Sequence, residues 1–148
     1  MDRRQQGVGL LELLLICFIS AILISIATPG YTRHIVKTNR LDGQFALLDL
    51  ANRLTHYHTH HHTYATATIA SGDPATDILA RAETANGHYR LHIAQQTTTL
   101  FQLHAIPRQR QAAQDKWCQT LTLTDQGNRD IIQGPGGQPI GDAVACWI

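Results

Sequence analysis

The sequence predicts an α+β fold, in which one long N-terminal helix packs on a C-terminal antiparallel sheet. Apolar residues recur every three or four positions between Leu41 and Tyr57, as in a helix that buries one face. After residue 88 the period changes to two, which is typical of half-buried strands. A helix followed by three or four such strands is an α+β arrangement.

The first part of the helix is predicted by an apolar run. Residues 13–32 contain no charged side chain, and a helix of this length spans about 30 Å, the thickness of a hydrocarbon core. Pro29 and Gly30 are expected to kink or loosen the helix where this run ends. Two export signals remain alternatives on the residues alone: a signal peptide with a small-x-small cleavage site at 25–27, or a twin-arginine signal beginning at residues 3–4.

Glu12 is unexplained by either export signal. A carboxylate in the hydrocarbon region costs about 3 kcal/mol on insertion scales, and such a residue is by default functional. The alternative is that Glu12 lies near the positive end of a helix dipole, which favours a carboxylate. Both roles remain open.

The N-terminus resembles that of a type IV prepilin. A short basic leader ends at Gly7, Glu12 is the fifth residue after it, about 20 apolar residues follow, and Pro29 and Tyr31 stand just past them. Val8 and Gly9 depart from the Phe and Thr that are usual in the family. Two later segments resemble type IVa pilins at the end of the long helix and at the C-terminal disulfide region, namely "ALLDLANRLTHYHTHHHTYA" and "CQTLTLTDQGNRDI" with the terminal "ACWI".

The resemblance implies a pilin fold in three parts. Residues 1–7 would be a leader that prepilin peptidase removes, 8–29 the transmembrane and polymerisation half of the helix, and 30–148 a periplasmic or extracellular globular domain. Cleavage between Gly7 and Val8 would leave Val8 as the N-methylated first residue.

The resemblance also assigns assembly to Val8, Glu12 and Pro29. In the family, the glutamate of an incoming subunit is thought to pair with the amine of a neighbour, which sets the axial register of the filament. A buried amine and carboxylate are tolerated together and costly apart. The expected product is a filament built through the N-terminal helices.

The implied function is therefore structural, in a minor subunit of a type IV pilus that supports adhesion, twitching motility or DNA uptake. The expected partners are other pilin subunits, prepilin peptidase, the inner-membrane assembly machinery and, before assembly, the inner membrane itself. The precursor would cross the inner membrane once, and the assembled form would be extracellular. A type II secretion pseudopilin and a DNA-binding minor pilin for competence are the alternatives.

Three cysteines occur in the chain. Cys17 lies in the apolar run and is expected to be inert. Cys118 and Cys146, close to the C-terminus, suggest a disulfide and an oxidising compartment, although two free thiols in a cytosolic fold remain the alternative. Within the family, a cysteine pair in this place favours a pilus pilin over a pseudopilin.

The remaining elements follow from composition and period. Residues 63–87 are rich in Ala and Thr and are predicted to form a connection with one short helix at 75–81. Strands are predicted within 88–94, 98–106 and 118–124, with hairpin connections at 95–97 and 125–128 and a Gly/Pro loop over 134–142.

Histidines crowd the end of the predicted helix. His56/His60 and His58/His62 are i, i+4 pairs, a spacing that can chelate a transition metal. The two pairs lie on different faces, however, and no Cys or nearby Glu completes a ligand set. We therefore expect no metal and no cofactor, and a surface whose charge rises in acid.

Nucleic-acid binding is predicted for one short basic segment and not for the chain as a whole. The net charge is +1, which gives no general attraction to phosphate. Four residues of "PRQRQAAQDKW" could still track phosphates and stack a base: Arg108, Arg110, Lys116 and Trp117. No nucleophile, metalloprotease or phosphate-loop motif is present, so we do not expect an enzyme.

Overall fold

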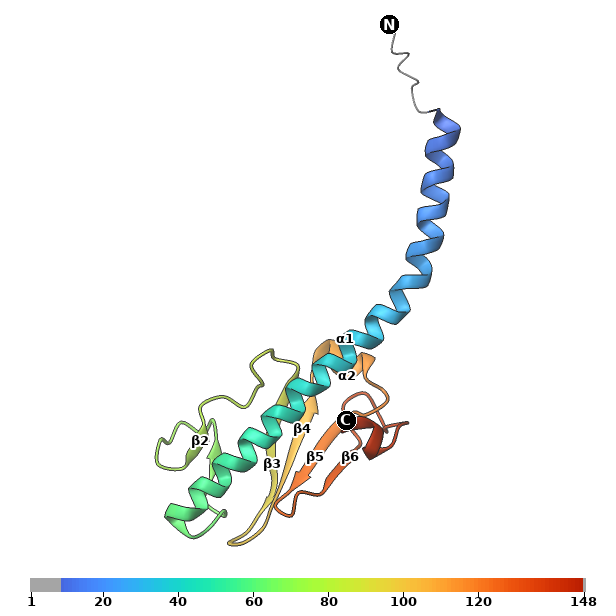
Figure 1. Ribbon diagram of the computed structural model, residues 1–148. Helices are drawn as coiled ribbons and strands as arrows, with labels where there is room; N and C mark the ends of the chain where they lie inside the picture. Colours follow the sequence, from blue (N-terminus) through green and yellow to red (C-terminus); the bar gives the residue numbers. More distant parts are fainter. Residues whose placement is uncertain (1–8, 148) are drawn as a thin grey trace, which may run out of the picture. The chain divides into compact units, whose positions relative to one another are not determined.

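A computed structural model describes residues 9–147, apart from the side chains of residues 27–29. The described residues form two compact units, divided between Ile35 and Val36. The elements in chain order (Figure 1) are α1 (Leu10–His61), β1 (Thr68–Ile69), β2 (Asp77–Leu79), β3 (Tyr89–Gln96), β4 (Phe101–Pro107), α2 (Gln109–Gln114), β5 (Thr120–Thr124), β6 (Arg129–Ile132) and α3 (Ala143–Cys146).

The first unit is the N-terminal part of α1. Its large apolar side chains from Leu10 to Ile26 are exposed. An 18-residue stretch of α1 has a mean hydropathy of 2.7, so the helix is long and apolar enough to cross a membrane. The helix continues through Pro29 and Gly30. Because exposed apolar surface of this extent is unfavourable in water, this unit needs lipid or other protein around it.

The second unit contains the rest of α1, which crosses one face of the main sheet (Figure 1). One stripe of the helix is buried there: Leu47, Leu50, Leu54 and Tyr57. The apolar face that the sequence predicts also includes Leu41, Phe45 and Leu48, but these three side chains are exposed. The prediction of a single sheet-facing stripe is therefore wrong for these three residues, which lie on a different side of the helix.

The main sheet has the order β3-β4-β5-β6 and is antiparallel throughout. The predicted alternation holds in β4, where Phe101, Leu103 and Ala105 are buried. Leu121 and Leu123 of β5 join the same core. The α+β prediction is confirmed, and the connection at 125–128 joins β5 to β6 as expected.

Two local predictions are wrong. No helix forms at 75–81; Asp77–Leu79 is instead the strand β2, which pairs in parallel with β1. Ile78 and Leu79 pack against the core from this strand, and tertiary packing of this kind overrides weak helix propensity. The first hairpin turn also lies later than predicted. β3 runs to Gln96, and Thr97 donates its backbone N–H to the carbonyl oxygen of Leu100 at 2.9 Å.

Candidate nucleic-acid interface beside the disulfide

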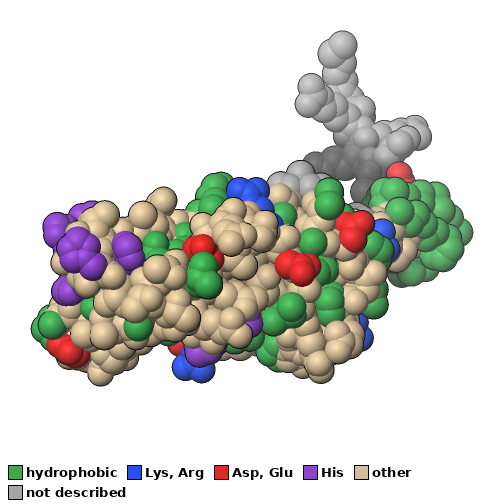
Figure 2. Space-filling view, turned by 90° about the horizontal axis from the view of Figure 1, so that it is seen from below, with side chains coloured by type: hydrophobic (Ala, Val, Ile, Leu, Met, Phe, Trp, Pro, Cys, Tyr) green, Lys and Arg blue, Asp and Glu red, His purple; other side chains and the backbone are tan. Residues whose placement is uncertain are grey.

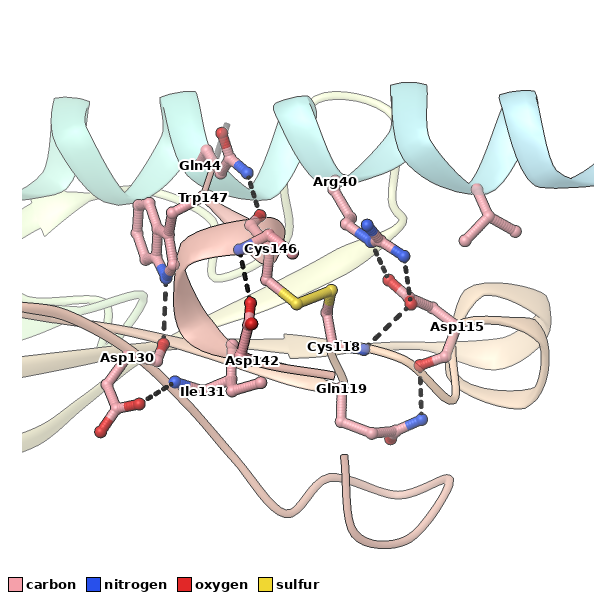
Figure 3. The surroundings of a disulfide bond; sticks show 12 residues. Arg40, Gln44, Asp115, Cys118, Gln119, Asp130, Ile131, Asp142, Cys146 and Trp147 are labelled. Atoms are coloured by element: carbon pink, nitrogen blue, oxygen red, sulfur yellow. Dashed lines mark hydrogen bonds and ion pairs between the residues drawn. A yellow bond between two sulfur atoms is a disulfide. The ribbon is translucent and has the colours of Figure 1, made fainter. Parts of the chain in front are cut away.

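The disulfide between Cys118 and Cys146 is present, as predicted. Its cysteines are 28 positions apart in sequence and both are buried. Gln44 of α1 donates from Nε2 to the carbonyl oxygen of Cys146 at 2.7 Å (Figure 3). Asp142 caps α3 by accepting from the Ala145 N–H at 2.7 Å. The disulfide, the cap and the glutamine together hold the C-terminal segment beneath α1.

Next to the disulfide, α2 is fixed on α1 by polar side chains. Asp115 follows α2 and accepts two hydrogen bonds from the Arg40 guanidinium (Figure 3). Gln111 lies inside α2, is buried, and donates to the Val36 carbonyl at 3.2 Å and to the Tyr89 hydroxyl at 3.1 Å. These contacts give α2 and the turn after it one defined position on the helix.

Tyr89 belongs to the same network. Burial, followed by the neighbouring Asp115 carboxylate, raises the pKa of Tyr89 well above its ordinary value. The phenol therefore stays protonated and uncharged at physiological pH. These buried side chains hold α2 from its inner side.

The predicted DNA-contacting residues lie along α2 and the turn that follows. Arg110 and Lys116 are exposed, and among the described residues neither forms a salt bridge. Arg108 is different, because its Nη1 lies 3.0 Å from Glu83 Oε1. A phosphate would have to compete with Glu83 for Arg108, so Arg110 and Lys116 are the better phosphate ligands.

Trp117 supplies a half-exposed aromatic surface at the end of this segment, with 50% of its area accessible. The C-terminal loop runs beside it, since Gly141 donates its backbone N–H to Trp117 O at 2.8 Å. A Cβ atom at Gly141 would collide with the indole ring. The indole thus lies against Gly141 and leaves about half of its residue's area open to solvent, which suits stacking on a base.

A family model matches residues 29–122 of the chain, which is more than half of it: "Type IV minor pilin ComP, DNA uptake sequence receptor". The chain belongs to this family. No curated protein matches the chain. The matched segment of this minor pilin begins at Pro29 and includes Arg110, Lys116 and Trp117. The family is one of structural pilus subunits, which favours the pilus interpretation over a type II secretion pseudopilin.

The other predicted site residues of this minor pilin are distributed along α1. Gly7 and Val8 lie outside the described residues. Glu12 is exposed in the first turn of α1, where the helix dipole favours a carboxylate, and Pro29 lies inside the helix. The histidines from His56 onward lie at the other end of α1, about 25 Å along the helix from the residues that contact α2.

Sequence reasoning did not find the network that orients α2. Arg40 and Asp115 are separated by 75 positions, as are Val36 and Gln111, and no local pattern connects them. The sequence shows only that Gln111 and Asp115 are four positions apart in a short polar segment. Such a spacing is too common to indicate that either side chain is buried.

Proposed function

We propose that this chain is a minor subunit of a type IV pilus that binds DNA through Arg110, Lys116 and Trp117. The observation that carries the proposal is that Arg110 and Lys116, which are exposed and form no salt bridge within residues 9–147, share one short segment with the half-exposed indole of Trp117. A DNA uptake receptor family matches this segment. Cations bind phosphate without reading sequence, and an aromatic ring adds stacking on any base.

The route to the pilus begins in the inner membrane. Prepilin peptidase would cut after Gly7, Val8 would be methylated, and residues 8–29 would hold the subunit in the membrane, with 30–148 on the far side. Glu12 would then pair with the amine of a neighbouring subunit during polymerisation. A carboxylate and an amine that are buried together satisfy each other, whereas either alone is costly.

The exposed residues of α1 support a polymerised state. The apolar side chains of the first unit have no cover in the described chain. In the second unit, Leu41, Phe45 and Leu48 form a separate exposed apolar surface at i, i+4 and i+7. Contact with other pilin subunits would remove both surfaces from water.

Processing and assembly are tested in the host membranes. Mass spectrometry of the native N-terminus should give a chain that starts at methylated Val8, whereas a start at Thr28 would indicate an ordinary signal peptide. A Glu12→Ala variant should remain in the membrane and fail to enter pili. Normal incorporation of this variant would disprove the assembly role of Glu12.

DNA binding is tested with the full chain in a neutral detergent, using fluorescence anisotropy of a short labelled duplex over a range of salt concentrations. The logarithm of the DNA-binding constant should fall with the logarithm of the salt concentration, and Lys116→Ala or Arg110→Ala should each reduce the size of this slope by about 1. Trp117→Ala should weaken the free energy of DNA binding by about 1–3 kcal/mol if the indole stacks on a base. Arg108→Ala should have a smaller effect because Glu83 already engages that side chain.

Arg53→Ala is the matched control, since Arg53 is an exposed arginine remote from α2 and paired with Asp49. This variant should bind DNA as the unaltered chain does. An equal loss in Arg53→Ala and Lys116→Ala would mean that DNA senses only total charge. The absence of any binding at low salt would end the DNA proposal and leave the pilus subunit.

A further inference from the structure

The C-terminal end of α1 carries a concentrated group of histidines. Figure 2 shows histidine side chains gathered at one end of the globular unit, and the chain has five of them between positions 56 and 62. Sequence spacing alone offers two chelating pairs, His56/His60 and His58/His62. The tertiary structure distinguishes between these two pairs.

The second pair is not arranged to share an ion. α1 ends at His61, and His62 has φ 55°, in the left-handed region, so its side chain leaves the helical row. The His58 ring packs on Tyr64, with centroids 4.5 Å apart. His61 is likewise occupied, since its ring stacks on Tyr57 at 4.0 Å.

The ring separation of the first pair matches that of a chelate. The rings of His56 and His60 have centroids 4.8 Å apart and are tilted by 57°. Two imidazoles that bind one ion through nitrogen atoms at about 2.0–2.1 Å, with a tetrahedral or right-angled bond angle, have centroids about 5 Å apart. We propose that His56 and His60 bind one Zn²⁺, Cu²⁺ or Ni²⁺ ion, whose remaining positions hold water.

The surroundings of the pair tolerate a cation. Both histidines line an open hollow of about 500 Å³, together with Arg53, Asp77 and His61, whose ring is stacked on Tyr57. The Arg53 charge is offset by Asp49, whose Oδ2 lies 2.7 Å from Arg53 Nε. Hydrogen bonds, first of all from the Thr68 hydroxyl, lower the pKa of Asp77 to about 2, so a carboxylate faces the hollow at neutral pH.

The site differs from a closed structural metal centre. Among residues 9–147, no group of three or more His, Cys, Asp or Glu side chains converges to hold an ion. Two protein ligands and several waters make an exchangeable site, which suits an ion that also accepts a ligand from outside. The pair lies far along α1 from Lys116 and Trp117, so the inference does not depend on DNA binding.

The test uses the untagged full chain in detergent, titrated by calorimetry with zinc, copper or nickel chloride alone. His56→Gln and His60→Gln should each weaken binding by about tenfold or more, because the second imidazole binds at high effective concentration. Copper should also give the spectrum of two coordinating nitrogens per ion. Acid should release the ion, since a coordinating imidazole must be neutral.

His58→Gln and His62→Gln are the matched controls, because each removes one histidine from the same segment but neither residue lines the hollow. They should leave the affinity within about twofold, and circular dichroism should show an unchanged helix content in all four single variants. If the control substitutions weaken binding as much as His56→Gln, the segment is only a diffuse histidine-rich surface. That result, or unchanged binding in the His56→Gln, His60→Gln double variant, overturns the proposal.

Discussion

Arg40 and Asp115 form a two-point ion pair that joins α1 to the turn before the disulfide. Nε of Arg40 lies 2.7 Å from Oδ2 of Asp115, and Nη2 lies 2.9 Å from Oδ1. The carboxylate is fully buried, and it also accepts from the Cys118 N–H at 3.2 Å. A parallel pair of charge-assisted hydrogen bonds fixes both distance and orientation, so this contact sets where Lys116 and Trp117 lie relative to α1.

The first prediction concerns this pair. Arg40→Ala leaves a buried carboxylate without its cation and should lower the free energy of unfolding by about 3–5 kcal/mol. Arg53→Ala removes an exposed pair within the same helix and should cost about 0.5 kcal/mol or less. Thermal unfolding of both variants of the full chain, followed by near-ultraviolet circular dichroism, measures the difference. Equal losses would mean that the burial of Asp115 is unimportant.

The disulfide gives the second prediction. Replacing Cys118 and Cys146 with serine should reduce the free energy of unfolding by about 3–4 kcal/mol in the chain-entropy model for this loop length. The Gln44 bond to Cys146 should weaken as α3 loosens. Cys17→Ser is the control, because Cys17 is an exposed free thiol. Reductant should destabilise the unaltered chain and the Cys17→Ser variant alike, but not the doubly substituted one.

Gly43 gives the third prediction, which concerns packing between α1 and β3. A Cβ atom at Gly43 would lie 3.0 Å from the Tyr89 ring, and this ring is buried and held by Gln111. Gly43→Ala should gain up to about 1 kcal/mol of helix propensity but lose about 1–3 kcal/mol to overpacking.

The expected net change for Gly43→Ala is a lower melting temperature. Asn52→Ala, at an exposed position of the same helix, carries the propensity gain without the clash and should raise it slightly. A stabilised Gly43→Ala variant would show that the Tyr89 ring can move aside.

The fourth prediction concerns pH. Asp77 accepts from Thr68 Oγ1 at 2.6 Å and from the Gly72 N–H at 2.8 Å, and these bonds belong to the set that lowers its pKa to about 2 from 3.8. Because the pKa of Asp77 is lower in the folded chain than in the unfolded chain, its ionised carboxylate stabilises the fold at pH values above the unfolded-state pKa. This stabilisation is lost as the pH falls through the folded-state pKa. The loop at 68–77 should therefore loosen between about pH 4 and pH 2.

Hydrogen exchange of the Ser71 and Gly72 amides measures this loosening directly. Both amides donate to the Asp77 carboxylate. Asp77→Asn should exchange them faster already at pH 7 and remove the acid transition. Asp73→Asn is the comparison, since Asp73 accepts from Ala75 in the same loop but does not bond those two amides. An acid transition that persists in Asp77→Asn would contradict the prediction.

Several features of the fold could be predicted because they depend on the order of apolar and polar residues over short segments. Phe101, Leu103 and Ala105 alternate with polar residues, and the structure buries all three in β4. The position of Cys118 and Cys146 near the C-terminus indicated the disulfide that the structure contains. Such signals are readable because one buried face imposes a fixed period on the chain.

Other features were misread for an equally specific reason. Leu41, Phe45 and Leu48 repeat with helical period, yet they are exposed. A helical period shows that a helix has an apolar face, but it does not show which part of the protein packs against that face. Residues 77–79 form a strand because Thr68 and Asp77 lie side by side in β1 and β2. That pairing involves two segments whose joint preference no local window contains.

By itself, the sequence determined that a long helix precedes antiparallel strands, and it showed the apolar N-terminal run, the cysteine pair and the crowding of histidines near His60. Only the tertiary structure decided which i, i+4 histidine pair lines one hollow. It also decided that Arg108 has a carboxylate partner, whereas Arg110 and Lys116 have none in the described part of the chain. The physical reason is range. Periodicity and propensity act over a few residues, whereas Arg40 meets Asp115 across 75 positions, and contacts of that separation exist only once the whole chain has packed.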